Sequence, residues 1–370
     1  MANNNDKKVL NVPALRFPEF TGEWEKCKLS KVCSFFSGGT PPSSNKEYYN
    51  GNIPFIRSGE LHNDETELFI TKEGLDNSAA KMVEVGDLLL ALYGATSGDI
   101  AISKIKGAIN QAILCIRTKQ NKKFVESVWN KHVARLLQTY LQGGQGNLSA
   151  DIVKNIPFYF TNIEEQNKLA RFISLLDQRI AAQNKIIEKL ESLIKGIAQN
   201  VARNNKPNIR LSECLEYSSS TLQESDVCEN GTYPVYGANG IVGYIDNYNA
   251  EKEAVYIIKD GSGVGTVSYV TGKCSATGTL NTLQAKEGYS LQYLYYMLKV
   301  FNFEPYKTGM AIPHIYFKDY GKAKIFCPSY TEQLKYVGVL STIDNKLSAE
   351  QSILTDLSLQ KQYLLSQMFI

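Results

Sequence analysis

One long helical segment is written twice in this chain, and the repeat constrains the fold more than any other feature. The stretch EEQNKLARFISLLDQRI at 164–180 returns 167 residues later as TEQLKYVGVLSTIDNKL at 331–347. Among the identities, Glu165, Gln166 and Asp177 recur as Glu332, Gln333 and Asp344. A repeat at fixed spacing indicates a duplicated structural unit. The sequence therefore predicts two copies of one module.

Each copy carries apolar residues at alternating steps of four and three, which is typical of a heptad helix with one apolar stripe. A polar residue breaks the stripe at the same point in both copies, Gln183 in the first and Glu350 in the second. Because such a stripe needs a partner, we predict that the two helices pair, with an intermolecular coiled coil or packing on a sheet as alternatives. The predicted seam comprises Leu169, Ile173, Leu176, Ile180, Gln183, Ile187 and Leu190 with Leu340, Ile343, Leu347, Glu350, Leu354 and Leu357.

A globular block precedes each helix. Both blocks contain short β-like segments and a later helical stretch, at 125–141 in the first and 291–301 in the second. The polar, proline-broken stretch 204–208 separates the first helix from the second block. We therefore predict an α+β chain with mixed, β-rich domains at 1–160 and 206–327, each followed by a long helix at 161–205 and 328–370.

A glycine-rich turn follows an apolar strand in each block. The strand at 88–93 leads into Gly94–Gly98, and the strand at 254–260 leads into Gly261–Gly265. The second turn has the glycine spacing of a nucleotide loop, but the β-branched and aromatic residues at 266–270 favour a second strand over a helix. The expected structure is a tight hairpin.

The sequence contains no catalytic or metal-binding constellation. The three histidines lie far apart, the seven cysteines form no C-x-x-C pair, and neither a P-loop nor a G-x-S-x-G motif occurs. The NIPF stretches at 52–55 and 155–158 are near misses to the N-P-P-[YF] motif of amino-methyltransferases, but no cofactor loop accompanies them. We therefore predict that the chain binds no cofactor or metal and is not an enzyme.

The formal net charge of +3 is too small to indicate a polyanion partner by itself. No apolar run approaches the roughly 18 to 20 residues that a membrane span needs. The polar N-terminal stretch has no apolar signal region, so a cytoplasmic location without membrane association is expected.

The series of features in the first block, made again without SGGTP in the second, resembles the DNA-specificity subunit of type I restriction-modification systems. It consists of SGGTP at 37–41, NIPFI at 52–56, a glycine turn, and Glu-Gln at the start of a heptad helix. The resemblance covers nearly the whole chain. It implies two target-recognition domains, each reading one half of a split, asymmetric site in double-stranded DNA, on two helices that pair as an antiparallel coiled coil with pseudo-twofold symmetry.

The resemblance also implies the partners. Two modification subunits would dock on the helices and methylate adenine with S-adenosylmethionine, and ATP-dependent restriction subunits would cleave DNA in the full complex. In an antiparallel pair, Gln183 and Glu350 would meet near the middle, where a buried polar contact could fix the register.

Residues that read DNA need donors or acceptors on loops that reach a groove. Loops of both blocks supply such groups, and the shorter second block lacks SGGTP, which implies different targets for the two halves. The rival hypotheses are a non-DNA scaffold, with two β-rich ligand-binding modules spaced by a coiled coil, and an enzyme that methylates DNA itself. The candidates are Ser37, Gly38, Gly39, Thr40, Arg57, Tyr93, Thr96, Ser97, Gln145 and Asn147 in the first block, and Tyr236, Asn239, Lys259, Ser262, Thr277, Lys307, Thr308, Met310 and His314 in the second.

Overall fold

The chain forms two compact units, and the computed structural model describes residues 10–140, 148–309 and 312–370. Unit 1 consists of Met1–Ala182 with Leu354–Ile370, and unit 2 consists of Gln183–Ile353. Both boundaries fall inside long helices, α5 (Ile163–Asn204) and α9 (Tyr330–Met368). Each unit therefore contains a β-rich body and one part of each long helix, which confirms the predicted α+β class.

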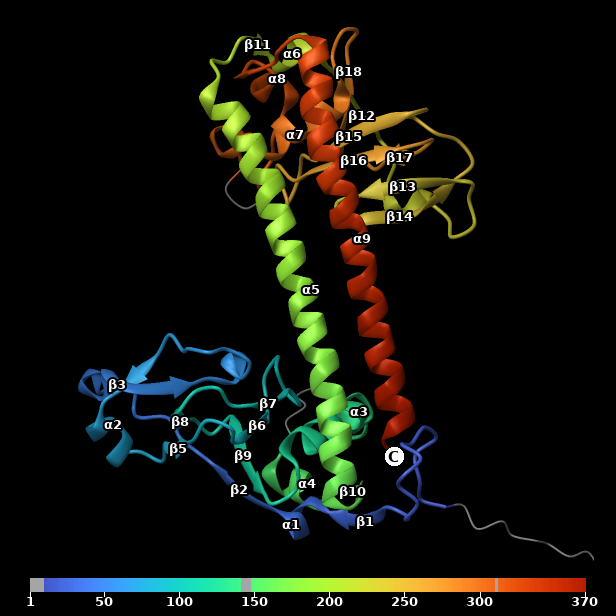
Figure 1. The fold of residues 1–370 in the computed structure, drawn as a ribbon. Helices are drawn as coiled ribbons and strands as arrows, with labels where there is room; N and C mark the ends of the chain where they lie inside the picture. The colour runs from blue at the N-terminus through green and yellow to red at the C-terminus, as the bar shows by residue number, and fades with distance from the viewer. Residues whose placement is uncertain (1–9, 141–147, 310–311) are drawn as a thin grey trace, which may run out of the picture. The chain divides into compact units, whose positions relative to one another are not determined.

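Unit 1 is built on the four-stranded antiparallel sheet β2-β9-β6-β7, with α3 against β7 (Figure 1). A second sheet has the order β4-β3-β8-β5, and β1 pairs with β10. The strands are β1 (Glu25–Lys28), β2 (Cys33–Ser37), β3 (Tyr49–Ile56), β4 (Phe69–Ile70), β5 (Lys81–Val83), β6 (Leu88–Ala91), β7 (Ile100–Ile102), β8 (Gly107–Ile109), β9 (Ile113–Thr118) and β10 (Pro157–Phe160). The helices are α1 (Leu29–Val32), α2 (Lys72–Asp76), α3 (Lys122–Tyr140) and α4 (Ala150–Asn155).

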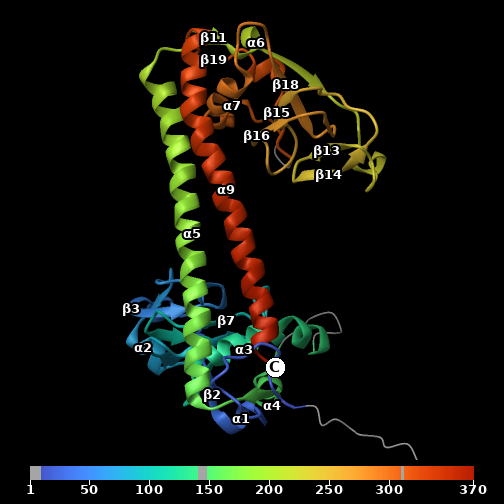
Figure 2. The ribbon, with the colours of Figure 1, turned by 45° about the vertical axis from the view of Figure 1, so that its right-hand side comes forward.

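Unit 2 repeats this arrangement in its own antiparallel sheet β12-β18-β15-β16, in the sheet β14-β13-β17, and in the pair β11-β19. The strands are β11 (Ile209–Arg210), β12 (Leu215–Ser219), β13 (Tyr233–Gly237), β14 (Gly240–Ile245), β15 (Glu253–Ile258), β16 (Val267–Thr271), β17 (Ser275–Ala276), β18 (Leu280–Ala285) and β19 (Lys324–Ile325). The helices are α6 (Leu211–Cys214), α7 (Leu291–Lys299) and α8 (Phe317–Tyr320). Figure 2 shows α6 and α7 from a second side.

The 167-residue repeat extends well beyond the helices. Strand β6 matches β15, β9 matches β18 and β10 matches β19 at that spacing, and both units contain a parallel pair, β3 with β8 and β13 with β17. Strand β14 pairs antiparallel with β13 as β4 does with β3, whereas α2 and β5 of unit 1 have no counterpart among the described residues of unit 2. The second unit is therefore shorter, as predicted from the sequence.

The recurring glutamines, Gln166 and Gln333, hold a helix start in each unit. The side-chain oxygen of Gln166 accepts from the amide of Asn121 at 3.1 Å, and that of Gln333 accepts from the amide of Ser290 at 2.9 Å. These amides lie just before α3 and α7, where helical backbone donors have no partner within the helix. The repeat thus conserves the contact that joins each long helix to its own domain.

In unit 1, the parts of α5 and α9 lie side by side in opposite directions. Leu169 shares a core cluster with Met368, whereas Asp177, further along α5, pairs with Lys361, earlier in α9, at 2.5 Å. A chain order that reverses between the two contacts defines an antiparallel pair. Lys123 of α3 also pairs with Asp177, so one carboxylate joins three helices.

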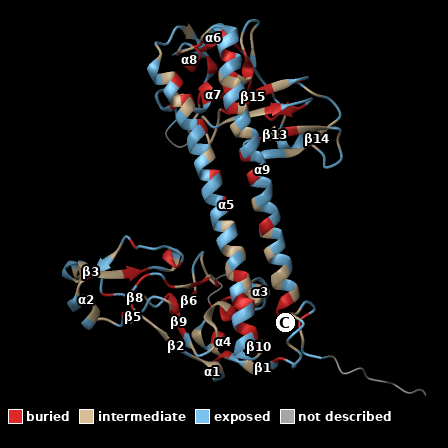
Figure 3. Ribbon diagram, in the orientation of Figure 1, coloured by how far each residue is buried: buried red, intermediate tan, exposed pale blue. Residues whose placement is uncertain are grey.

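In unit 2, Gln183 of α5 contacts Glu350 of α9. Its side-chain amide donates to the backbone oxygen of Glu350 at 2.9 Å and also to the carboxylate, which Lys346 contacts as well. Further along α5, Ile194 lines a cavity with Asp344 from earlier in α9, so this pair is also antiparallel. Every predicted seam residue is buried or half-buried. Buried and intermediate positions recur among exposed ones along both α5 and α9 (Figure 3). Interlocking as a coiled coil along the full length remains a prediction.

Replacing both Gln183 and Glu350 with leucine should raise the melting temperature of the protein. A buried polar pair is often no more stabilising than well-packed apolar side chains of similar size, although it can fix the register of two helices. Calorimetry of the double variant measures the effect, and Gln183→Leu alone is the control, because it leaves Glu350 without that donor and should lower the melting temperature. A double variant that melts no higher than wild type would contradict this interpretation.

No helix among residues 10–140, 148–309 and 312–370 is long and apolar enough to cross a membrane.

Candidate nucleic-acid interface

Two glycine turns have the same backbone hydrogen bonds, residue for residue, at the 167-residue spacing. In unit 1 the amides of Gly98, Ser97 and Asp99 donate to the oxygens of Ala91, Gly94 and Thr96 at 2.9, 3.1 and 2.9 Å. In unit 2 the amides of Gly265, Val264 and Thr266 donate to the oxygens of Ile258, Gly261 and Gly263 at 2.9, 3.2 and 3.0 Å. The second turn joins antiparallel β15 and β16, which confirms the predicted hairpin.

The last glycine of each turn is required by both backbone conformation and space. Gly98 has φ +86° and Gly265 has φ +92°, a region that residues with a Cβ rarely adopt. A Cβ on Gly98 would lie 2.8 Å from the Cγ2 of Val133, and one on Gly265 would lie 3.1 Å from the Cβ of Phe303. Trp129 also donates its ring N–H to the oxygen of Gly98 at 2.8 Å. The two turns are therefore fixed in shape.

We call the end of each four-stranded sheet that carries this turn the turn end. In unit 1, β2 ends and β9 begins there, since Ser37 pairs with Leu114 and Ala91 with Ile113. In unit 2, β12 ends and β18 begins there, because Ser219 pairs with Asn281. The turn ends bring together segments that lie far apart in the sequence, which makes them the best candidates for a ligand surface.

The SGGTP segment follows β2 at the turn end of unit 1, and the close approach of neighbouring atoms requires glycine at both of its glycine positions. A Cβ on Gly38 would lie 1.8 Å from the backbone oxygen of Ile109, and one on Gly39 would lie 2.5 Å from the Cβ of Ala79. The hydroxyl of the exposed Thr40 donates to the side-chain oxygen of Gln111 at 2.7 Å. Of this segment, Thr40 presents the most accessible polar side chain.

The other described candidates of the first turn are partly accessible. Ser97 donates its hydroxyl to the oxygen of Leu92 at 3.0 Å, which leaves only the lone pairs of that hydroxyl for a ligand. Thr96 and Tyr93 are half-buried, and burial raises the pKa of Tyr93. Sequence reasoning missed the ion pair between His62 and Asp99 beside this turn, at 2.9 Å, which raises the pKa of His62.

Arg57 is engaged by carboxylates. Its guanidinium contacts Glu60 and Glu67, each at 2.7 Å, and Glu60 also accepts from the hydroxyl of Thr66 at 2.9 Å. Burial alone would raise the pKa of Glu60, but hydrogen bonds from Arg57, Thr66 and the amide of Glu67 lower it to about 2. The two carboxylates therefore compensate most of the positive charge that Arg57 could offer to DNA.

Replacing Glu60 with glutamine should destabilise unit 1 by about 1.5–3 kcal/mol at neutral pH, the usual contribution of hydrogen bonds to a charged group. Because the folded state holds the pKa near 2 and the unfolded state near 4.5, the stabilisation is complete above pH 4.5 and is lost towards pH 2. Urea unfolding of wild type and variant between pH 7 and 3 should therefore show a shrinking difference.

Glu67→Gln is the matched control for this experiment. Glu67 contacts the same guanidinium but is 86% exposed, so its loss should change the unfolding free energy by less than about 1 kcal/mol. A Glu60→Gln effect that stays constant from pH 7 to 3 would contradict the assignment.

The second-unit candidates divide into accessible and occupied groups. His314 pairs with Asp260 at 2.7 Å, and backbone bonds with Thr308 hold the histidine beside the turn. Asn239, Ser262 and Thr308 are exposed, and Lys259 is half-buried. Lys307 pairs with Glu304 at 2.6 Å, Tyr236 packs against Tyr256, and Thr277 is only 2% exposed beside Thr279.

Thr277 therefore supports the turn end from inside, and its contact with DNA stays a prediction like those of the other candidates. Gln145, Asn147 and Met310 lie outside the described residues. Sequence reasoning missed Tyr217, Tyr316 and Lys318, which border the turn end of unit 2. No motif connects these positions, and only the fold brings them together.

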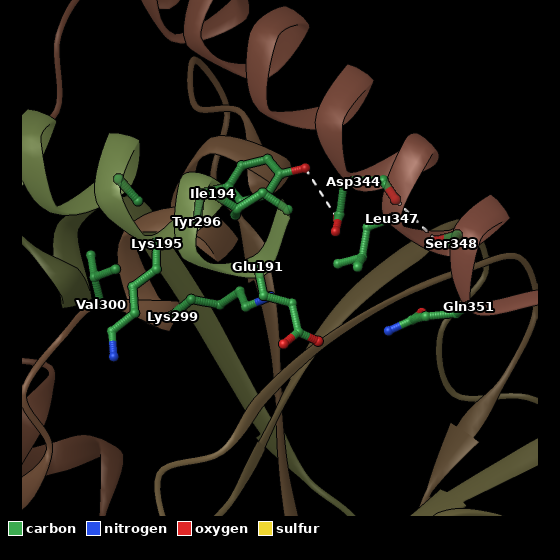
Figure 4. A pocket seen from close by; sticks show the side chains of 11 residues that line it. Glu191, Ile194, Lys195, Tyr296, Lys299, Val300, Asp344, Leu347, Ser348 and Gln351 are labelled. Carbon is green, nitrogen blue, oxygen red and sulfur yellow. Dashed lines mark hydrogen bonds between the residues drawn. The ribbon is translucent and has the colours of Figure 1, made fainter. Parts of the chain in front are cut away.

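A separate cavity of about 470 Å³ lies in unit 2 where α5, α7 and α9 meet (Figure 4). Tyr296 donates to the carboxylate of Asp344 at 3.2 Å, and the ammonium groups of Lys195 and Lys299 and the carboxylate of Glu191 border the space. The described residues contain no group of three or more His, Cys, Asp or Glu side chains that could hold a metal ion.

The duplicated fold places the chain in a class of two-domain proteins. Each domain has a similar turn end, and the side chains at the two turn ends differ. Comparison with known proteins identifies the family. The model of the type I restriction modification DNA specificity domain matches residues 21–192 and again residues 205–358. The chain belongs to this family of type I restriction-modification DNA-specificity proteins.

Individual relatives agree with the family model. The type I restriction enzyme EcoprrI specificity subunit of Escherichia coli is 22% identical over 356 residues, which cover 87% of this chain and 88% of the relative. The MjaVIII specificity subunit of Methanocaldococcus jannaschii is 24% identical over 192 residues, 50% of this chain and 43% of the relative. The crystal structure of the type I S subunit from M. genitalium shares the fold, with a TM-score of 0.66 and 18% identity over 97% of this chain and 99% of that one.

Proposed function

We propose that each turn end reads one half of a bipartite, asymmetric DNA site. The observation that carries the proposal is the pair of turn ends, whose glycine turns have the same backbone hydrogen bonds and whose side chains differ. Backbone geometry places a surface against DNA, whereas the side chains on it select the bases. Two such surfaces with different side chains select two different half-sites. The paired long helices would then set the number of base pairs between them.

The proposal assigns the chemistry to other subunits. Modification subunits that dock on the helices would methylate adenine with S-adenosylmethionine, and ATP-dependent restriction subunits would cleave the DNA. This chain would select the DNA sequence and would carry out no catalytic step. The polar groups at its turn ends would form the hydrogen bonds to DNA. Family membership supports this division of labour, because the family is defined by DNA specificity.

A chimaera tests the proposal. Residues 208–327 are replaced by the corresponding segment of a relative with a mapped site, and the full chain is expressed with its modification subunits. The expected result is a methylated site in which one half changes and the other half and the spacing stay the same. A chimaera that assembles normally but methylates the original site would count against the proposal. A chain that assembles without any sequence preference would favour the rival scaffold function.

A further inference from the structure

We propose that a pocket at the turn end of unit 2 binds a phosphodiester group of the DNA backbone, and this inference rests on the proposed function. The pocket has a volume of about 220 Å³. Its polar lining comes from four segments that meet at the turn end: Tyr217 and Ser219 of β12, Lys259 directly after β15, Asn281 of β18, and Tyr316 with Lys318 at the start of α8.

The fold fixes the positions of the two cations. Lys259 directly follows β15 and precedes the glycine turn, and its amide donates to the oxygen of Thr279 at 3.0 Å. Its own backbone oxygen accepts from the amide of Ile315 at 2.9 Å, which ties the segment before α8 to the turn. Lys318 follows three residues later. Backbone bonds thus bring both lysines to one rim.

Among the described residues, neither ammonium group forms an ion pair. Within the described ranges, no carboxylate lies within 4.0 Å of Lys259 or Lys318. The adjacent carboxylate of Asp260 pairs instead with His314 at 2.7 Å, and the amine of Lys318 lies over the ring of Tyr316, 5.2 Å from its centroid. Two uncompensated cations beside one pocket favour an anionic ligand.

The remaining polar groups point to the same ligand class. Asn281 is already occupied, since its oxygen accepts from Ser219 at 3.2 Å and its amide donates to the hydroxyl of Tyr320 at 3.1 Å. The ring of Tyr217 stacks on Phe317 with centroids 4.6 Å apart, which holds one wall. Within the described part of the chain, the lysine ammonium groups and tyrosine hydroxyls of the lining have no hydrogen-bond partner and can donate to a ligand. Such groups commonly contact phosphate oxygens, whereas reading a base pair usually takes a specific pattern of donors and acceptors.

Unit 1 lacks this charge arrangement. At the matching positions it has Leu92 in place of Lys259, Ser149 in place of Tyr316 and Asp151 in place of Lys318. The two lysines of this pocket therefore have no equivalent at the matching positions of unit 1. The pocket would fix the position of unit 2 on the duplex without contributing to the choice of bases.

The test is the double variant Lys259→Gln/Lys318→Gln, assembled with its modification subunits. Equilibrium binding is measured over a series of salt concentrations on two short duplexes, one with the mapped site and one unrelated. We expect the double variant to bind both duplexes about tenfold or more weakly. The slope of log K against log salt should become shallower by about 1, the change that accompanies the loss of one phosphate contact.

Lys322→Gln is the matched control. Lys322 lies four residues beyond Lys318, is 77% exposed and pairs with Asp319 at 3.9 Å, so its loss should leave affinity and slope close to wild type. An unchanged slope in the double variant would overturn the inference, and so would a loss confined to the mapped site with altered preference at one base pair. A wild-type complex with no preference for the mapped site would contradict the proposed function instead, while the unrelated duplex would still report the phosphate contact.

Discussion

Replacing Gly98 with alanine should abolish recognition of one half of the DNA site and leave the other half readable. The new Cβ forces φ +86° on a residue that disfavours it and lies 2.8 Å from Val133, so the turn must move. A strain of about 1–3 kcal/mol at one turn is small against the stability of a whole unit but large for hydrogen bonds to bases. Gly265→Ala should have the mirror effect on the other half.

Three duplexes measure this effect: the intact site, the site with its first half changed, and the site with its second half changed. Wild type should lose affinity for both changed duplexes. For Gly98→Ala, changing the half-site that unit 1 reads should no longer lower the affinity. Changing the half-site that unit 2 reads should still lower the affinity at least tenfold. Gly196→Ala in α5 is the control, because a Cβ there meets nothing within 4 Å and should be neutral or slightly stabilising. Equal loss of both halves in Gly98→Ala would contradict independent readers.

Replacing Phe369 with alanine should destabilise unit 1 by about 3–5 kcal/mol, the usual cost of removing a buried phenylalanine side chain. Phe369 is 1% exposed, and its ring lies 5.5 Å from that of Phe124 and 6.4 Å from that of Trp24. The lost contacts join the residue after α9 to the body of the domain. Hydrogen exchange should rise in peptides of β1 and α3 more than in peptides of α7.

Tyr363→Ala is the matched control for this loss. Tyr363 lies on the same helix but is 58% exposed, so its removal should change the unfolding free energy by no more than about 0.5 kcal/mol. If hydrogen exchange rose equally in α7 and α3 of the Phe369 variant, the claim that this contact stabilises unit 1 locally would be contradicted.

The helices and their seam could be predicted because their information is local and periodic. Spacing alone predicts that Leu169, Ile187 and Leu340 lie in the helix seam, and all three are buried in the structure. The glycine turns were also predictable, since the strand before each and the β-branched residues after the second are contiguous in sequence. The repeat made these predictions more secure, because each helix and each glycine turn occurs again at the same spacing.

The turn ends could be predicted only in part, because long-range pairing forms them. Nothing near Thr277 in the sequence indicates that its side chain is buried, and nothing near Lys318 indicates that Tyr217 lies close by. The parallel pairing of β3 with β8 likewise joins segments about fifty residues apart. Arg57 was predicted as a DNA contact, whereas its compensation by Glu60, three residues later, became visible only with the side chains in place.

The central claim is that one chain carries two different DNA readers. The most direct measurement is to express the chain with its modification subunit in a host free of DNA methylation and to map N6-methyladenine across the genome at single-base resolution. The account predicts a split, asymmetric site with one methylated adenine in each half and a fixed number of unread base pairs between them. Methylation at a single continuous site, or at a palindrome with identical halves, would contradict it.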